Sequence, residues 1–111
     1  MAISTTDYKH CTMVKMDGRV DSNTGDDLMA AFEKVQESGV FKIVFDMTEI
    51  DFMTSKGWWV LIQTQKACKR YNRGELVLAG VPQKILDSLD LVGMSHYFQI
   101  FDDVVSAVGS F

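Results

Sequence analysis

The stretch FKIVFDMTEIDFMTSKGWWVLIQTQKACKR, residues 41–70, decides which fold this chain of 111 residues can adopt. Its first part, residues 41–46, is apolar on both sides, which predicts a strand inside a sheet with two covered faces. A short connector (47–53) and a polar step, TSKG (54–57), lead to an apolar helix expected from Trp58. Such a step places the free N–H groups of the first helical turn beside Thr54 and Ser55, where the helix dipole stabilises an anion.

Strands and helices alternate through the rest of the chain. Residues 8–16 alternate with the period of two that is typical of a strand. Apolar residues then repeat at helical spacing up to Gly39, with Asp26 and Asp27 expected in the first turn of that helix. Further on we expect a buried strand at 76–79, a helix from Pro82, an edge strand at 97–101 and a last helix capped by Asp102. This order predicts one α/β domain over residues 1–111, with a mixed central sheet of about four or five strands and about four helices.

The composition narrows the class of protein. A hydrophobic content of 47% and a charged content of 23% are typical of soluble globular domains. The formal charge of −4 argues against general affinity for nucleic acid. The first residues, MAIS, carry neither a basic segment nor an apolar core, and no apolar run approaches the ~20 residues of a spanning helix, so we expect a cytoplasmic protein without direct membrane insertion. Cys11 and Cys68 match no disulfide or metal spacing and are expected to be free, buried thiols.

One group of cations stands out at the end of the long central stretch, namely Lys66, Lys69, Arg70 and Arg73. Cations at the C-terminal end of a helix complement its dipole. A solvated helix end is the simpler interpretation of this group, and a functional basic patch is the alternative.

The residues do not predict an enzyme. Nucleophilic catalysis needs a base within reach of the hydroxyl group, and His10 and His96 belong to elements with no evident reason to converge on Ser55. His10 and Cys11 are neighbours on an expected strand and point to opposite faces, so they do not form part of one metal site. We therefore expect no catalytic residue, no metal site and no cofactor.

Asp46, at the end of the central strand, resembles the phosphorylated aspartate of the receiver domains of two-component signalling. The resemblance fails elsewhere, because no acidic pair ends the first strand and no Lys-Pro follows a late strand. Asp46 is more simply interpreted as a residue that ties down the connector leading to Ser55.

The order of residues in the central stretch resembles that of the STAS domain family, and within it the small anti-sigma factor antagonists of bacteria. The features are DMT at 46–48, IDFM at 50–53, Ser55 two residues before Gly57, and Leu61-Ile62. The resemblance extends to residues 74–80, 89–93 and 98–108, and so covers nearly the whole chain. The family usually has Asp-Ser-Ser-Gly or Asp-Ser-Thr-Gly at the central step, so Thr54 and Lys56 are departures, whereas Ser55 keeps the position that accepts phosphate.

The resemblance implies a STAS-like fold and a partner-switching function. The unmodified domain would bind an anti-sigma factor that is also a serine kinase, phosphorylation of Ser55 would release it, and a phosphatase would reverse the change. The implied partner-binding residues are Asp21, Thr54, Ser55, Lys56, Gly57, Trp58 and Trp59. An alternative is a STAS subunit that is never phosphorylated and that regulates or scaffolds a membrane transporter complex. The resemblance also leaves room for weak nucleotide binding.

Overall fold

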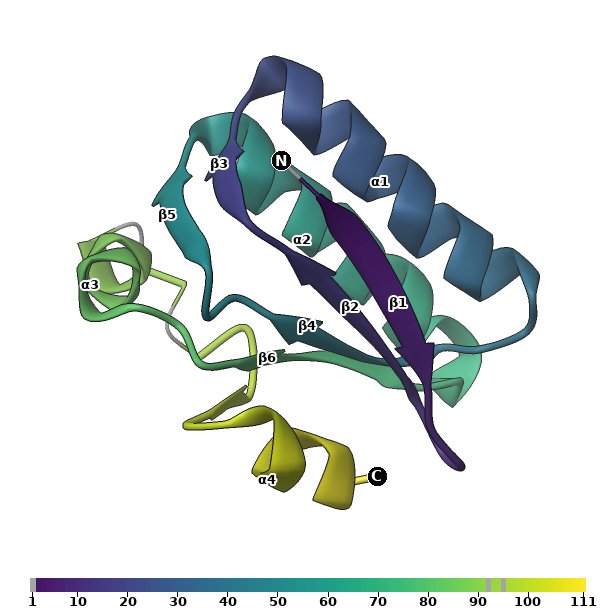
Figure 1. The fold of residues 1–111 in the computed structure, drawn as a ribbon. Coiled ribbons are helices and arrows are strands. Elements are labelled where there is room, and N and C mark those ends of the chain that lie inside the picture. The colour runs from purple at the N-terminus through teal and green to yellow at the C-terminus, as the bar shows by residue number, and fades with distance from the viewer. Residues whose placement is uncertain (1, 92, 95) are drawn as a thin grey trace.

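The computed structural model describes residues 2–91, 93–94 and 96–111, and it has the mixed α/β architecture expected from the sequence. The central sheet has five strands in the order β1-β2-β4-β6-β7 (Figure 1). β1 (Ile3–Asp7) is antiparallel to β2 (Thr12–Met16), whereas β4 (Lys42–Asp46), β6 (Glu75–Ala79) and β7 (Ile100–Phe101) run parallel to β2. The resulting sheet is mixed, with a single antiparallel strand at one edge.

Four α-helices cover the two faces of this sheet. α1 (Ser22–Glu37), α2 (Ser55–Lys69) and α3 (Gln83–Leu91) supply buried residues to a large core on one face, and α4 (Val104–Gly109) supplies Ala107 to a smaller core on the other. Figure 1 shows α4 on the opposite side of β4 and β6 from α1 and α2. Within the described residues, no helix combines the length and apolar character needed to cross a bilayer.

The central strand β4 is buried on both faces, as its composition predicts. Ile43 and Phe45 belong to the core beneath the three long helices, and Val44 belongs to the core beneath α4. The ring of Phe32 on α1 meets the ring of Phe45 edge-on, with centroids 5.3 Å apart. β4 therefore joins the two halves of the hydrophobic core.

A second, two-stranded sheet lies beside the main one. It is formed by β3 (Gly18–Val20) and β5 (Ile50–Met53), which pair in parallel. The sequence predicts residues 50–53 as part of a connector (47–53) and the next helix from Trp58. Both predictions are wrong, because residues 50–53 form β5 and α2 begins at Ser55. β5 finds its hydrogen-bond partner about thirty residues earlier in the chain, so no local pattern reveals that it is a strand.

Three other boundaries differ from expectation. Residues 8–11 form the turn of the β1–β2 hairpin, with the Tyr8 N–H donating to the Cys11 carbonyl at 2.8 Å, so the strand begins only at Thr12. The last helix is capped by Asp103, which accepts from the Ser106 N–H at 2.7 Å, and not by Asp102. The expected strand at 97–101 is confirmed as an edge strand but is only two residues long.

The two cysteines are free and buried, as predicted. Burial raises the pKa of both thiols, because the low-dielectric interior disfavours the thiolate. Cys68 also accepts a hydrogen bond from the Gln36 amide at 3.3 Å. Both side chains are therefore kept in the unreactive thiol form.

Candidate functional site

The two-stranded sheet brings the beginnings of α1 and α2 together. Val20 and Met53 are the last residues of β3 and β5 and are partners in the parallel register. The next residues, Asp21 and Thr54, are the N-caps of α1 and α2. The N–H and the hydroxyl group of Thr54 both donate to the Val20 carbonyl, at 3.0 and 2.9 Å. Both helices consequently start side by side at one end of the molecule (Figure 1).

α1 begins with a complete capping box. Asp21 Oδ1 accepts from the N–H groups of Asn23 and Thr24 at 3.0 Å each, and the Thr24 hydroxyl oxygen accepts from the Asp21 N–H at 2.9 Å. The bonds that the carboxylate accepts, chiefly the one from the Thr24 N–H, hold the pKa of Asp21 below its ordinary value. Because the helix starts at Ser22, Asp26 and Asp27 lie in its second turn, and their predicted first-turn position is wrong.

α2 begins without such a cap. The Thr54 hydroxyl group is bonded to the Val20 carbonyl, and no side chain in the described part of the chain caps the helix. The first N–H groups of a helix have no partner within the helix and carry its positive partial charge. Ser55, the first residue of α2, is exposed at this point. A phosphoryl group on Ser55 would therefore lie where free N–H donors and the helix dipole stabilise an anion.

Lys56 on α2 contacts α1 through its side chain. Its side chain lies over Gly25, where an added Cβ would be only 2.7 Å from Lys56 Cγ. Lys56 Nζ is 2.9 Å from Asp26 Oδ1 and 4.6 Å from the centre of the Trp59 ring. A cation in the first turn of a helix opposes the dipole, and here the carboxylate of the neighbouring helix offsets that cost. The sequence gives no sign that Asp26 belongs to this site, because its contact with Lys56 joins two helices and residues thirty positions apart.

Exposed aromatic rings lie on either side of the central serine in the sequence. Trp59 is 47% exposed and Phe52, on β5, is 46% exposed. The guanidinium of Arg19 lies 4.4 Å from the centre of the Phe52 ring. Phe52 is missed from the sequence because residues 50–53 are predicted as a connector, and its exposure follows only from the pairing of β5 with β3.

Two of the predicted partner-binding residues lie beneath this surface. Trp58 is only 8% exposed and belongs to the core. Gly57 is buried, and an added Cβ would be 2.9 Å from Met53 Cε and 3.0 Å from Val20 Cγ1. These two residues support the surface from below. We call the accessible residues the helix-start surface: Arg19, Asp21, Asp26, Phe52, Thr54, Ser55, Lys56 and Trp59.

Asp46 holds the connector that leads toward this surface. One of its carboxylate oxygens accepts from the N–H of Thr48 at 3.0 Å and also from the Thr48 hydroxyl group. The other oxygen is 3.8 Å from Lys15 Nζ. The side chain thus has the structural role that the sequence analysis preferred for it.

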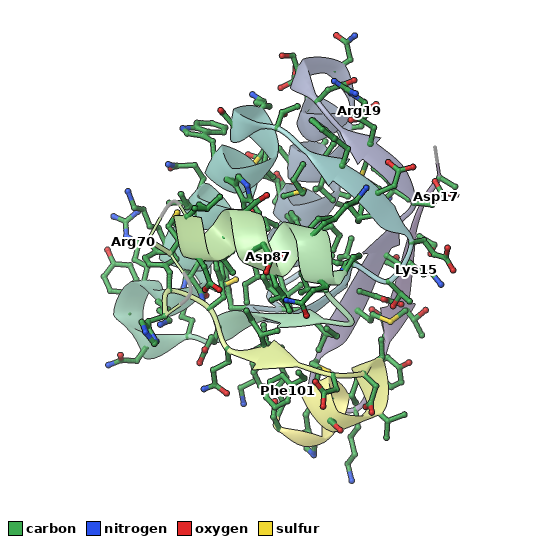
Figure 2. The ribbon with its side chains drawn as sticks, turned by 90° about the vertical axis from the view of Figure 1, so that its left-hand side faces the viewer. Lys15, Asp17, Arg19, Arg70, Asp87 and Phe101 are labelled. Carbon is green, nitrogen blue, oxygen red and sulfur yellow. The ribbon has the colours of Figure 1, made fainter. Side chains whose placement is uncertain are left out.

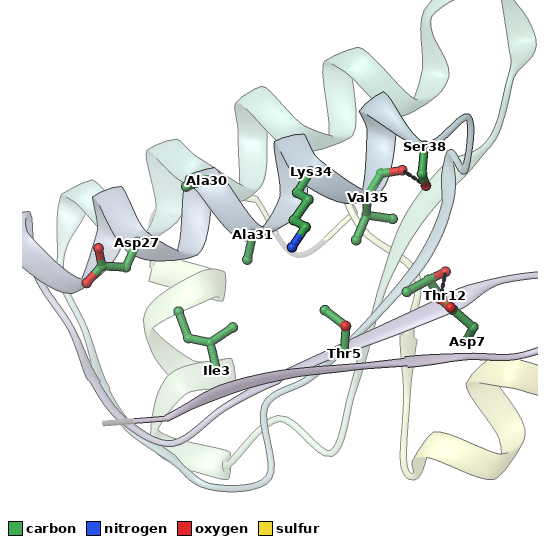
Figure 3. A pocket seen from close by; sticks show the side chains of 10 residues that line it. All are labelled: Ile3, Thr5, Asp7, Thr12, Asp27, Ala30, Ala31, Lys34, Val35 and Ser38. Carbon is green, nitrogen blue, oxygen red and sulfur yellow. Dashed lines mark hydrogen bonds between the residues drawn. The ribbon is translucent and has the colours of Figure 1, made fainter.

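Three hollows in the described part of the chain lie away from Ser55. One hollow, of ≈540 Å³, lies between β1 and α1 and is lined by Ile3, Thr5, Ala31 and Lys34, among others (Figure 3). Two more, of ≈430 and ≈490 Å³, lie elsewhere, and His10 lines the first of these. None of the three is lined by residues 54–59.

The five-stranded mixed sheet and the helices that cover it make the fold of a STAS domain. The family model described as "STAS domain" matches residues 2–107, and the chain belongs to this family. Among curated proteins, the chain is 28% identical over 83 residues to the anti-sigma-B factor antagonist of Listeria monocytogenes serovar 1/2a, covering 75% of this chain and 72% of the relative.

Solved structures share the fold. A putative anti-sigma factor antagonist from Thermotoga maritima has a TM-score of 0.89 and 14% identity, with 97% of this chain and 92% of that chain covered. The anti-sigma factor antagonist SpoIIAA in its unphosphorylated form has a TM-score of 0.83 and 12% identity, with coverages of 98% and 95%. Its phosphorylated form, from Bacillus, has a TM-score of 0.77 and 13% identity, with 98% of each chain covered.

Proposed function

We propose that this protein is an anti-sigma factor antagonist that acts by partner switching. In the unphosphorylated state the helix-start surface binds an anti-sigma factor that is also a serine kinase. Phosphorylation of Ser55 releases that partner, and a phosphatase restores binding. The observation that carries the proposal is the exposed Ser55 at the uncapped start of α2, within a STAS fold whose relatives are named as such antagonists.

A phosphoryl group at Ser55 suits the helix but not a docked partner. It adds nearly two negative charges and three acceptor oxygens. The free N–H groups of α2 stabilise these charges within the chain itself. A partner packed on Trp59 and Phe52 would instead have to desolvate the phosphate, which costs binding energy. Release therefore needs no refolding, and SpoIIAA keeps its similarity to this chain in both of its forms.

We further propose that the protein acts by binding alone and not as an enzyme. Ser55 is exposed at the end of the molecule, whereas His10 lines a hollow beside the β1–β2 turn. Among the described residues, no three His, Cys, Asp or Glu side chains are grouped in a way that could hold a metal ion. The chemistry in this proposal belongs to the kinase and the phosphatase.

The direct test is the intact mass of the protein after incubation with ATP and the serine-kinase proteins of its own organism. Ser22 offers a matched control, because it is the exposed first residue of α1, beside the start of α2. We expect one added phosphoryl group on the wild type and on Ser22→Ala, and none on Ser55→Ala. The Asp21 cap occupies N–H groups at the start of α1, which makes Ser22 the less favourable position for a phosphate.

Two results would contradict this function. A phosphoryl group that persists in Ser55→Ala would place the modified residue elsewhere. A stable complex with a partner that forms while no kinase modifies the chain would favour the other function considered, a constitutive scaffold such as a STAS subunit of a transporter complex.

Replacing Lys56 by serine tests the departure from the usual family step. We expect the affinity for the anti-sigma factor to fall about threefold to tenfold, because Trp59 loses the cation beside it and the two helix starts lose their ion pair. Stability should change by less than about 1 kcal/mol, since the ion pair is partly exposed. Surface plasmon resonance and urea unfolding measure the two effects, with Lys84→Ser on α3 as the control. Unchanged affinity and an unchanged phosphorylation rate would make Lys56 an ordinary surface lysine.

A further inference from the structure

The end of the molecule at the C-terminus of α2, opposite Ser55, carries a cluster of basic residues. Two neighbouring hollows share Lys42 and Arg73; Lys9 lines one of them and Lys69 the other. The guanidinium carbons of Arg70 and Arg73 lie 5.1 and 5.8 Å from the centre of the Tyr71 ring. We call this group the basic pole: Lys9, Lys42, Lys69, Arg70, Tyr71 and Arg73. It holds five of the eleven lysines and arginines of a chain whose formal charge is −4.

In the described part of the chain, the cations of the basic pole form no ion pair with a carboxylate. The ion pairs found in the described residues are made by Lys15, Arg19 and Lys56, and none of the five pole cations lies within 4.0 Å of a carboxylate. Asp7 and Glu75 are the acidic residues that line the two hollows. Clustered like charges repel one another and have a cost in the free protein. An anionic partner would remove that cost.

A strained turn presents an aromatic ring in the middle of this group. Tyr71 belongs to a short 3₁₀ turn after α2 (Arg70–Asn72), has a φ of 60° and is 78% exposed; Asn72 follows with a φ of 57°. Two consecutive residues other than glycine in the left-handed region are unfavourable. Strain of this kind is often retained where it positions a side chain for function. Here it holds a tyrosine out into solvent between two arginines.

We propose that the basic pole docks the protein on the surface of an anionic lipid bilayer. Lysine and arginine are attracted to anionic headgroups, and tyrosine is suited to the boundary between headgroups and acyl chains. A planar bilayer contacts one end of the molecule only. An extended polyanion such as a nucleic acid would run on to the rest of the chain, which carries the negative excess.

The arrangement leaves the helix-start surface free. Ser55 and Lys69 are the first and last residues of α2, a helix of 15 residues, and are therefore about 20 Å apart. Figure 2 shows Arg70 on a different side of the molecule from Arg19, which belongs to the helix-start surface. Membrane docking is thus independent of the function proposed for Ser55, and a docked molecule still presents that residue to a partner.

Vesicle co-sedimentation of the full chain tests this inference. We expect binding at least about tenfold stronger to vesicles with one-third phosphatidylglycerol than to pure phosphatidylcholine, and a steep loss as salt is raised. Lys69→Glu and Arg70→Glu should each weaken binding about fivefold or more, because each reverses one charge beside Tyr71. Lys84→Glu on α3 makes the same change of charge away from the pole and should have less than about half that effect.

Tyr71→Gly separates membrane contact from folding. Glycine adopts a positive φ without strain, so the melting temperature of this variant should not fall. Vesicle binding should nevertheless weaken several-fold, because the aromatic ring is lost. A variant that binds vesicles as well as the wild type would remove Tyr71 from the contact.

Three outcomes would overturn the proposal. Equal binding to anionic and neutral vesicles would show that the charge of the headgroups is not recognised. Equal losses in Lys69→Glu and Lys84→Glu would show that the basic pole is not the surface used. Tighter binding of a single-stranded oligonucleotide or a polyglutamate peptide at the same salt, lost in Lys69→Glu and Arg70→Glu, would assign the basic pole to that partner instead.

Discussion

The Ser55→Glu variant is expected to bind the anti-sigma factor about tenfold to hundredfold more weakly than the wild type, a loss of about 1.4–2.8 kcal/mol. The added carboxylate lies at the start of α2, where it is stabilised within the chain but must be desolvated beneath a partner that covers Trp59 and Phe52. Isothermal titration calorimetry with the kinase that modifies the wild type measures the change. Ser55→Ala should bind normally, because it removes the acceptor without adding charge.

The matched control is Ser22→Glu, which adds the same charge at the first position of the neighbouring helix. We expect the affinity of this variant to fall by less than about threefold, since charges at the edge of an interface change affinity little. Equal losses in the two glutamate variants would mean that general charge repulsion, and not the position of Ser55, controls release. Full affinity in Ser55→Glu would contradict a switch at this residue.

The free energy of unfolding of the Gln65→Leu variant is expected to be about 2–4 kcal/mol lower than that of the wild type. Gln65 is fully buried on α2, and its side chain bonds the backbone of β6 as a neighbouring strand would. Oε1 accepts from the Leu76 N–H at 2.7 Å, and Nε2 donates to the Leu76 carbonyl at 3.0 Å and to the Tyr97 carbonyl at 3.4 Å. β7 begins to pair with β6 only at Leu78, so leucine at position 65 would leave these backbone groups buried without partners.

Urea unfolding followed by circular dichroism measures this change. Gln63→Leu provides the control, because it makes the same substitution on the same helix at a half-buried position, and it should alter stability by less than about 1 kcal/mol. A loss below about 1 kcal/mol in Gln65→Leu would show that water or a shifted β7 satisfies the backbone of β6 in its place.

The predictions from sequence succeeded where short-range patterns control the structure. The two-sided apolar character of residues 41–46 predicts an interior strand, and β4 is one. The order of residues around Ser55 indicated the STAS family, and a helix follows the polar step, although it begins at Ser55 and not at Trp58. Both depend on the periodicity of a single element or on a local run of residues.

The features that were missed depend on contacts between distant segments. β5 is a strand because β3 pairs with it, and Gln65 lies in an apolar stripe because its amide bonds β6. The ion pair between Lys56 and Asp26 requires that two helices start side by side. A solvated helix end is the simpler interpretation of Lys69 and Arg70 from the sequence alone, because no local pattern shows that Lys9 and Lys42 come to the same end of the fold.

The small β3–β5 sheet has a consequence for how such proteins diverge after gene duplication. It carries the starts of α1 and α2, whereas the register of the main sheet is set by other strands. Substitutions at exposed positions such as Arg19 and Phe52 therefore alter the helix-start surface while the folding core stays the same. On the function proposed for this surface, two copies in one genome would acquire different partners, and so carry separate signals, by changing a few residues on a structure that is already stable.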